Sequence, residues 1–241
     1  LWNRLYRHVL VLILVTVILM TPWTIRNYRI FHRFIPTGMQ LGYNVWVGNS
    51  PGAKYVGEMV ATEEIDNYAG KYGYFAANDH GIQEVKNLAL HHPLTFLKLQ
   101  VIKTSIYFSA ARPEAFWFHL KGLPQLITAG LSSSFAYVLF IFGLAGFWLF
   151  IKKKDIISRM FLLFTLAAPA GVIWTVVETR YRFQLYPFLI VLGVLFLAEF
   201  IKNRKELSRI IIIAAALVTA NTLFDFLHNS ARVLERIHKL W

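Results

Sequence analysis

The sequence predicts an all-α, polytopic integral membrane protein with about five transmembrane helices and a large external loop that contains amphipathic helices. Two observations support this fold class. Of the 241 residues, 56% are hydrophobic and only 16% are charged, whereas an average soluble domain is about 25% charged. In addition, five stretches approach the roughly 20 apolar residues that a helix needs to cross the hydrocarbon core of a bilayer. The composition argues against a soluble globular enzyme.

The predicted spans, in chain order, cover residues 9–23, 134–151, 158–177, 183–201 and 207–224. The first span is short, and Pro22 followed by Arg26 is expected to end it, because proline interrupts helical hydrogen bonding. A signal peptide is rejected for this stretch, because no small-residue cleavage site follows. The chain then divides into a transmembrane helix (1–23), an external loop region (24–133), a four-helix transmembrane region (134–226) and an external C-terminal tail (227–241).

The distribution of basic residues orients the spans. Two short loops are rich in such residues, namely Lys152, Lys153, Lys154 and Arg159 between spans two and three, and Lys202, Arg204, Lys205 and Arg209 between spans four and five. Short basic loops stay in the cytoplasm, and these two agree because two spans separate them. The N-terminus is therefore expected in the cytoplasm and residues 24–133 on the non-cytoplasmic face.

The charge balance predicts a membrane partner. The 25 lysines and arginines exceed the 13 acidic residues, which gives a formal net charge of +12. Because the basic residues flank apolar runs, membrane lipids are the expected partners, and no nucleic acid. The absence of cysteine excludes disulfides, thiolate zinc sites and thiol nucleophiles. The pair His91-His92 lacks the spacing of helical zinc ligands, so no metal is expected, and no cofactor.

The external region is too long for an idle connection, since long loops are usually functional. Asp79 is expected to cap a helix over residues 81–91, and Pro93 to open another helix. The second helix carries an apolar stripe at helical spacing, with two lysines off it: Leu94, Leu97, Val101 and Phe108, and Lys98 and Lys103. Two interpretations remain open: the helix lies in the membrane interface, or its stripe packs against a core within the loop.

A series of motifs recurs along the chain. They are Pro22-Trp23-Thr24-Ile25-Arg26-Asn27-Tyr28, Phe34-Ile35-Pro36, Gly42-Tyr43-Asn44-Val45-Trp46-Val47-Gly48-Asn49-Ser50-Pro51, His92-Pro93-Leu94-Thr95-Phe96-Leu97-Lys98-Leu99, and Arg180-Tyr181-Arg182-Phe183 with Tyr186-Pro187-Phe188. In this order the set resembles bacterial membrane glycosyltransferases of the GT-C superfamily, akin to protein O-mannosyltransferases and aminoarabinose transferase (glycosyltransferase family 39-like). The resemblance covers almost the whole chain.

The resemblance implies an enzyme of the bacterial inner membrane and cell envelope. It would transfer a sugar from a polyprenyl-phosphate-linked donor to a lipid, glycan or protein acceptor on the non-cytoplasmic face. In that family the catalytic carboxylate lies in the first external loop, just after the first transmembrane helix, and nothing in this sequence matches that loop. The chain is therefore expected to be a carboxyl-terminal fragment, with the remaining N-terminal part as a partner, and no residue is assigned as catalytic.

The Arg-Tyr-Arg segment is the predicted binding site for the phosphate of the donor lipid. Arg180 and Arg182 straddle Tyr181 in the tight turn between spans three and four, and guanidinium groups bind phosphate oxygens in a bidentate manner. Arg26, just past the first span, is predicted to face the same cavity. The alternative is that these arginines are interface anchors. Glu178 is expected either to pair with one of the two arginines or to be a solvated flank.

Five further residues are candidate contacts of the saccharide or the acceptor: Asn27, Tyr28, Asn44, Trp46 and Asn49. Amides supply hydrogen bonds and aromatic rings supply flat apolar faces, which sugars require. The alternative is that the asparagines make turns and that the aromatic residues pack.

Two other functions remain open. A transporter or flippase for an anionic lipid or sugar would use the same arginines without a general base, although the paired repeats of such proteins are absent from this sequence. A non-catalytic membrane subunit would need neither transfer nor transport.

Overall fold

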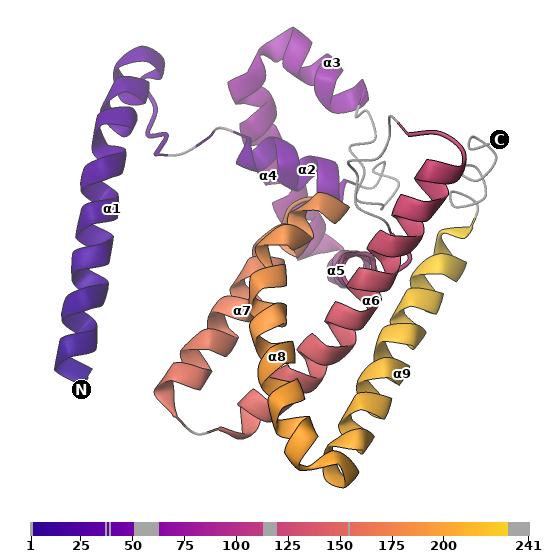
Figure 1. Cartoon of the computed structure of the whole chain (residues 1–241). Coiled ribbons are helices and arrows are strands. Elements are labelled where there is room, and N and C mark those ends of the chain that lie inside the picture. The colour runs from indigo at the N-terminus through magenta and orange to yellow at the C-terminus, as the bar shows by residue number, and fades with distance from the viewer. Residues whose placement is uncertain are drawn as a thin grey trace.

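The computed structural model describes residues 2–36, 38, 40–50, 63–112, 120–153 and 155–230, and these contain helices and no strand. Figure 1 shows their arrangement. The helices are α1 (Trp2–Phe31), α2 (Leu41–Asn49), α3 (Glu63–Tyr72), α4 (Tyr74–His91), α5 (Pro93–Tyr107), α6 (Leu123–Lys152), α7 (Ile156–Trp174), the 3-10 helix η2 (Thr179–Gln184), α8 (Tyr186–Lys202) and α9 (Arg204–His228). The predicted all-α class is confirmed for this part of the chain. Most of the predicted C-terminal tail lies outside the described residues.

Four helices are long and apolar enough to cross a membrane: Leu10–Phe31 within α1, and α6, α7 and α9. The fourth predicted span corresponds to α8, which has 17 residues. At 1.5 Å per residue it is about 26 Å long, slightly less than the hydrocarbon core. The prediction of membrane-spanning helices is thus confirmed for four of the five stretches, and a fifth span remains a prediction.

The first span does not end where the sequence analysis placed its end. Helix α1 continues through Pro22 and Arg26 to Phe31, so the expectation that these two residues terminate it is wrong. A proline removes only one backbone hydrogen bond. In an apolar surrounding the remaining backbone groups have no better partners than helical ones, so the helix continues. The hydroxyl of Thr21 donates to the carbonyl of Val17 within this segment.

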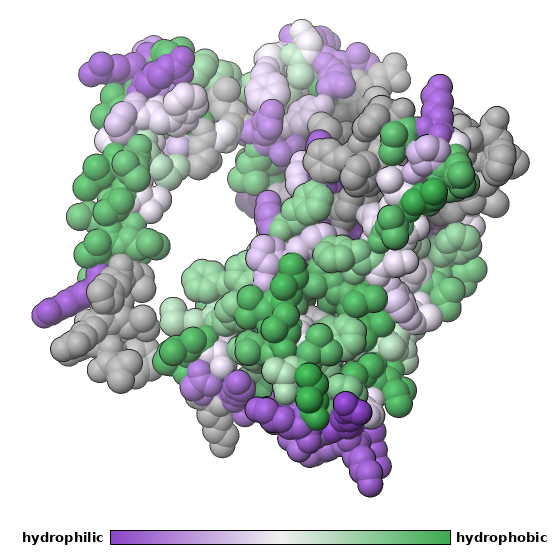
Figure 2. All heavy atoms as spheres, in the orientation of Figure 1, coloured by the Kyte–Doolittle hydropathy of each residue, from purple (hydrophilic) through white to green (hydrophobic). Residues whose placement is uncertain are grey.

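Helices α6 to α9 lie side by side as a bundle, whereas α2 to α5 gather at one end of it and α1 stands apart (Figure 1). Close contact between α6 and α8 depends on small residues: a Cβ on Gly146 would lie 2.1 Å from the carbonyl oxygen of Leu192. The two basic connections, α6–α7 and α8–α9, lie at the opposite end of the bundle from α2 to α5. Figure 2 shows this end as hydrophilic beneath an apolar belt.

Helix boundaries in the external region are correct at one proline and wrong at one carboxylate. Pro93 occupies the first turn of α5, as predicted. Asp79 caps no helix: α4 already begins at Tyr74, after Gly73, whose φ of 86° breaks the chain between α3 and α4. A left-handed glycine ends a helix more decisively than a downstream aspartate starts one. Asp79 instead pairs with Arg33 at 2.7 Å.

Helix α5 buries a different face from the predicted one. Its buried residues are Phe96, Leu99, Ile102, Lys103, Ser105, Ile106 and Tyr107. The predicted stripe of Leu94, Leu97 and Val101 is exposed, and Phe108 follows the helix half-buried. The interpretation that this stripe packs against a core within the loop is therefore wrong.

Candidate functional site

A polar pocket lies between α2 and α4, outside the bundle of α6 to α9. Its volume is about 590 Å³, and it is lined by Trp46, Asn49, Ser50, His80, Glu84, Val85, Asn87, Leu88, His91 and His92. The two helices approach closely at glycines, because a Cβ on Gly81 would lie 2.5 Å from the carbonyl oxygen of Gly42. Pockets of this size accommodate small organic ligands.

One wall of the pocket is aromatic. The buried ring of Trp46 meets the ring of His80 edge-on at 4.7 Å between centroids, and His80 stacks on Tyr68 at 4.3 Å with an interplanar angle of 8°. A carboxylate oxygen of Glu84 lies 3.9 Å from Nδ1 of His80. The wall therefore combines flat apolar surface with hydrogen-bonding groups, the combination that a sugar ring requires.

Asn49 joins three helices at the base of the pocket. Its Nδ2 donates to the carbonyl oxygens of Val45 at 2.7 Å and Trp174 at 3.1 Å. Its Oδ1 accepts from Nε2 of Gln100 at 2.7 Å and from Nζ of Lys103 at 2.9 Å. These four bonds match the full capacity of an amide, so Asn49 fastens α2 to α5 and to the end of α7.

Lys103 is a buried cation that the sequence analysis placed off the buried face. Its Nζ also donates to the carbonyl oxygen of Thr175 at 2.8 Å. Burial lowers the pKa of Lys103 from 10.5 to about 7. The spacing of Phe96, Leu99, Lys103 and Tyr107 follows a helical stripe as regular as the predicted one, and this signal shows that the lysine faces inward.

The stability of the protein is expected to rise with pH from about 7 to 10.5 because of Lys103. In this window the unfolded lysine is protonated while the folded one is neutral, so unfolding takes up a proton. The slope from this group is at most about 1.4 kcal/mol per pH unit. Thermal unfolding midpoints of the wild type and of Lys103→Met, measured over this range, should converge or diverge steadily with pH. Parallel curves would contradict the depressed pKa.

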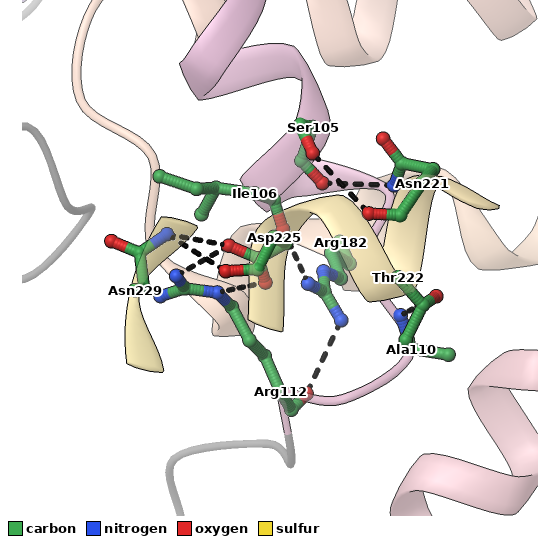
Figure 3. Close-up of polar contacts among 9 residues, drawn as sticks. All are labelled: Ser105, Ile106, Ala110, Arg112, Arg182, Asn221, Thr222, Asp225 and Asn229. Atoms are coloured by element: carbon green, nitrogen blue, oxygen red, sulfur yellow. Dashed lines mark hydrogen bonds and ion pairs between the residues drawn. The ribbon is translucent and has the colours of Figure 1, made fainter. Parts of the chain in front are cut away.

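Arg180 and Arg182 occupy opposite environments. The side chain of Arg180 is 45% exposed, pairs through Nε with Glu178, and lies over the ring of Tyr181 at 5.4 Å. Arg182 is 0% exposed, and its Nη2 donates to the carbonyl oxygen of Ile106 at 2.8 Å (Figure 3). The expected pairing of Glu178 with one of the two arginines is confirmed. Arg180 is the one whose guanidinium reaches solvent.

The structure brings two of the predicted site segments together. Trp46 is buried in a cluster with Val47, Ile65 and Val176, and Tyr181 packs against this same cluster. The Arg-Tyr-Arg segment at the start of α8 and the Trp46 pocket are therefore neighbours, although they are far apart in the sequence. Asn44 lies half-buried on α2, one turn before Gly48.

The chain matches no known protein. No protein-family model, no curated protein and no solved structure matches it. The chemistry of the site must therefore be inferred from its own residues. Among the described residues, no group of three or more histidine, aspartate or glutamate side chains is arranged to hold a metal ion.

The candidate residues on α1 lie away from the pocket. The guanidinium of Arg26 lies over the ring of Trp23 at 5.3 Å, and Tyr28 is exposed. Asn27 is buried and donates to the carbonyl oxygen of Ile35 at 3.0 Å, which stabilises the turn after α1. The structure does not bring these residues to Trp46 or Arg180 (Figure 1).

Proposed function

We propose that the chain is the carboxyl-terminal part of a membrane glycosyltransferase that uses a polyprenyl-phosphate-linked sugar as its donor. The acceptor is a lipid, a glycan or a protein on the non-cytoplasmic face. The observation that carries the proposal is the packing of Tyr181, next to half-exposed Arg180, against the Trp46 cluster. A cation able to hold a lipid phosphate is thereby set beside a pocket suited to a sugar.

The arrangement supports a division of labour at the site. The spans hold the lipid chain of the donor, and the phosphate meets Arg180 where α7 gives way to η2 and α8. The sugar enters the pocket against Trp46 and His80. The acceptor hydroxyl attacks the anomeric carbon, the bond from that carbon to the phosphate oxygen breaks, and the acceptor proton goes to a carboxylate from the N-terminal part of the enzyme. Arg180 stabilises the departing phosphate, an effect that strengthens as water is excluded.

Arg182 contributes differently in this proposal. Its buried guanidinium holds the carbonyl oxygens of Ile106 and Arg112, so it fixes η2 relative to the end of α5. This contact positions Arg180 and Tyr181 beside the pocket. Arg182 thus acts as a positioning residue in this scheme, and the phosphate contact rests on Arg180.

Arg180→Ala in the complete protein that carries this chain is expected to reduce the release of polyprenyl phosphate from labelled donors by about 100-fold, because the leaving phosphate loses its cation. Release is measured in native membranes with a panel of polyprenyl-phosphate sugars, so the acceptor need not be known. Arg180→Lys keeps the charge but not the planar fork, so it should recover only part of the activity.

Arg204→Ala is the matched control, because Arg204 is an arginine at the opposite end of the bundle, at the start of α9. It should leave the release unchanged. Equal losses of protein and activity in Arg180→Ala would assign the residue to folding. Movement of the intact donor across the membrane without release would favour the transporter, and the absence of both would favour a non-catalytic subunit.

A further inference from the structure

The first half of α5 carries an apolar stripe that the described elements leave uncovered. Leu94, Leu97 and Val101 are 80%, 58% and 63% exposed. They lie at i, i+3 and i+7, on one side of the helix. Three uncovered aliphatic side chains on one side of a helix indicate a partner that is itself apolar.

The second half of the same helix shows which way this stripe points. Ser105 lies four residues after Val101, on the same side, and is buried against α9, where Nδ2 of Asn221 donates to its carbonyl oxygen at 3.0 Å. Lys103 points to the other side, toward Asn49 in α2. The stripe therefore continues the side of α5 that faces the bundle, and it lies opposite the pocket.

The orientation of α5 places this stripe beside the apolar belt of the bundle. Figure 1 shows α5 nearly end-on, whereas α6 and α9 are seen along their length, so α5 runs across the bundle. Its first half is level with the end of α7, because the ring of Phe96 contacts that of Trp174 at 5.4 Å between centroids. Trp174 is itself exposed, as is usual for tryptophan at the interface between membrane and water.

We infer that the first half of α5 lies on the membrane surface, with Leu94, Leu97 and Val101 immersed between the headgroups and the acyl chains of the lipids. The helix overhangs the bundle with its apolar side toward the hydrocarbon layer, so lipid is what it meets there. Lys98 flanks the stripe and is exposed, which allows its ammonium group to reach lipid phosphates.

This contact has a consequence for the pocket. The side of α5 opposite the lipids holds Asn49 through Gln100 and Lys103. A helix held at the membrane surface on one side and bonded to α2 on the other fixes the height of the pocket above the bilayer. The inference does not depend on the proposed function, because it concerns only the contact between α5 and lipid.

The test uses the lack of cysteine in the chain, so that one substitution adds one thiol. Leu94→Cys, Leu97→Cys and Val101→Cys replace exposed side chains and leave the buried face of α5 intact. Each is labelled with bimane and reconstituted into nanodiscs of phosphatidylcholine and phosphatidylglycerol. Quenching is compared for iodide in water and for lipids with a spin label placed near the headgroup or deep in the acyl chain.

Labels on the stripe are expected to be quenched severalfold more by shallow spin-labelled lipid than by iodide. Two controls bracket this result: Gln83→Cys, exposed on α4, should respond to iodide, and Ile213→Cys, exposed in the middle of α9, should respond to the deep lipid label. Strong iodide quenching on the stripe would show that it faces water. Protection from every quencher would show that protein covers it, and either result overturns the inference.

Discussion

Arg112→Ala is expected to destabilise the protein by about 3–5 kcal/mol, because it leaves the carboxylate of Asp225 buried without its cation. Nε and Nη2 of Arg112 donate to the two carboxylate oxygens of Asp225, each at 2.7 Å. Asn229 donates to the same carboxylate from the next turn of the chain, at 2.9 Å. Figure 3 shows this pair at the end of α9, beneath the loop that follows α5.

The measurement is the midpoint of thermal unfolding in detergent, which should fall by about 10 °C. Arg33→Ala is the matched control, because it breaks an arginine–aspartate pair of the same 2.7 Å length whose partners are 48% and 55% exposed. Exposed pairs contribute at most about 1 kcal/mol. If the two variants lost the same stability, burial of Asp225 would not carry the effect.

The Arg112–Asp225 pair matters beyond its own energy, because neighbouring contacts depend on it. The carbonyl oxygen of Arg112 accepts from Nη1 of Arg182 at 3.3 Å, and the backbone N–H of Ala110 donates to the hydroxyl of Thr222 at 3.2 Å. Together these bonds tie α5, η2 and α9 to one another. Replacing both partners, as in Arg112→Met with Asp225→Leu, should restore most of the lost stability, because no unpaired charge remains.

The spans could be predicted from the sequence because a run of apolar residues is a local property. The hydrophobic stretches in α6, α7 and α9 needed no knowledge of their neighbours. The expected end at Pro22 failed for the opposite reason, since the penalty of a proline depends on what surrounds the helix. In water the freed backbone groups bind solvent and the helix ends, but a lipid-embedded helix has no such alternative.

The buried cations could not be predicted from local pattern. Lys103 was expected off the buried stripe and Arg182 was expected to face the donor, because a charged side chain is normally placed in water. Both are buried because carbonyl oxygens from distant segments, those of Thr175 and Ile106, accept their hydrogen bonds. The spacing of two arginines one residue apart likewise does not show which points outward.

The proximity of the pocket to Arg180 depends on one glycine, and Gly48→Ala is expected to destroy it. A Cβ on Gly48 would lie 1.9 Å from the carbonyl oxygen of Thr175 and 2.8 Å from its carbonyl carbon. These are backbone atoms, so α2 itself must move. The movement combines overpacking with the loss of the bonds from Asn49 to the end of α7, and the expected loss of stability is about 3 kcal/mol.

Gly70→Ala provides the matched control, because Gly70 lies in α3 where an added Cβ meets no atom within 4 Å among the described contacts. In an open helical position alanine is more favourable than glycine by up to about 1 kcal/mol, so this variant should unfold at the same temperature or slightly higher. The two substitutions are chemically identical and differ only in the backbone they meet. A Gly48→Ala protein as stable as Gly70→Ala would therefore mean that α2 does not pack on the loop that leads to Arg180, and the proposed site would lose its central contact.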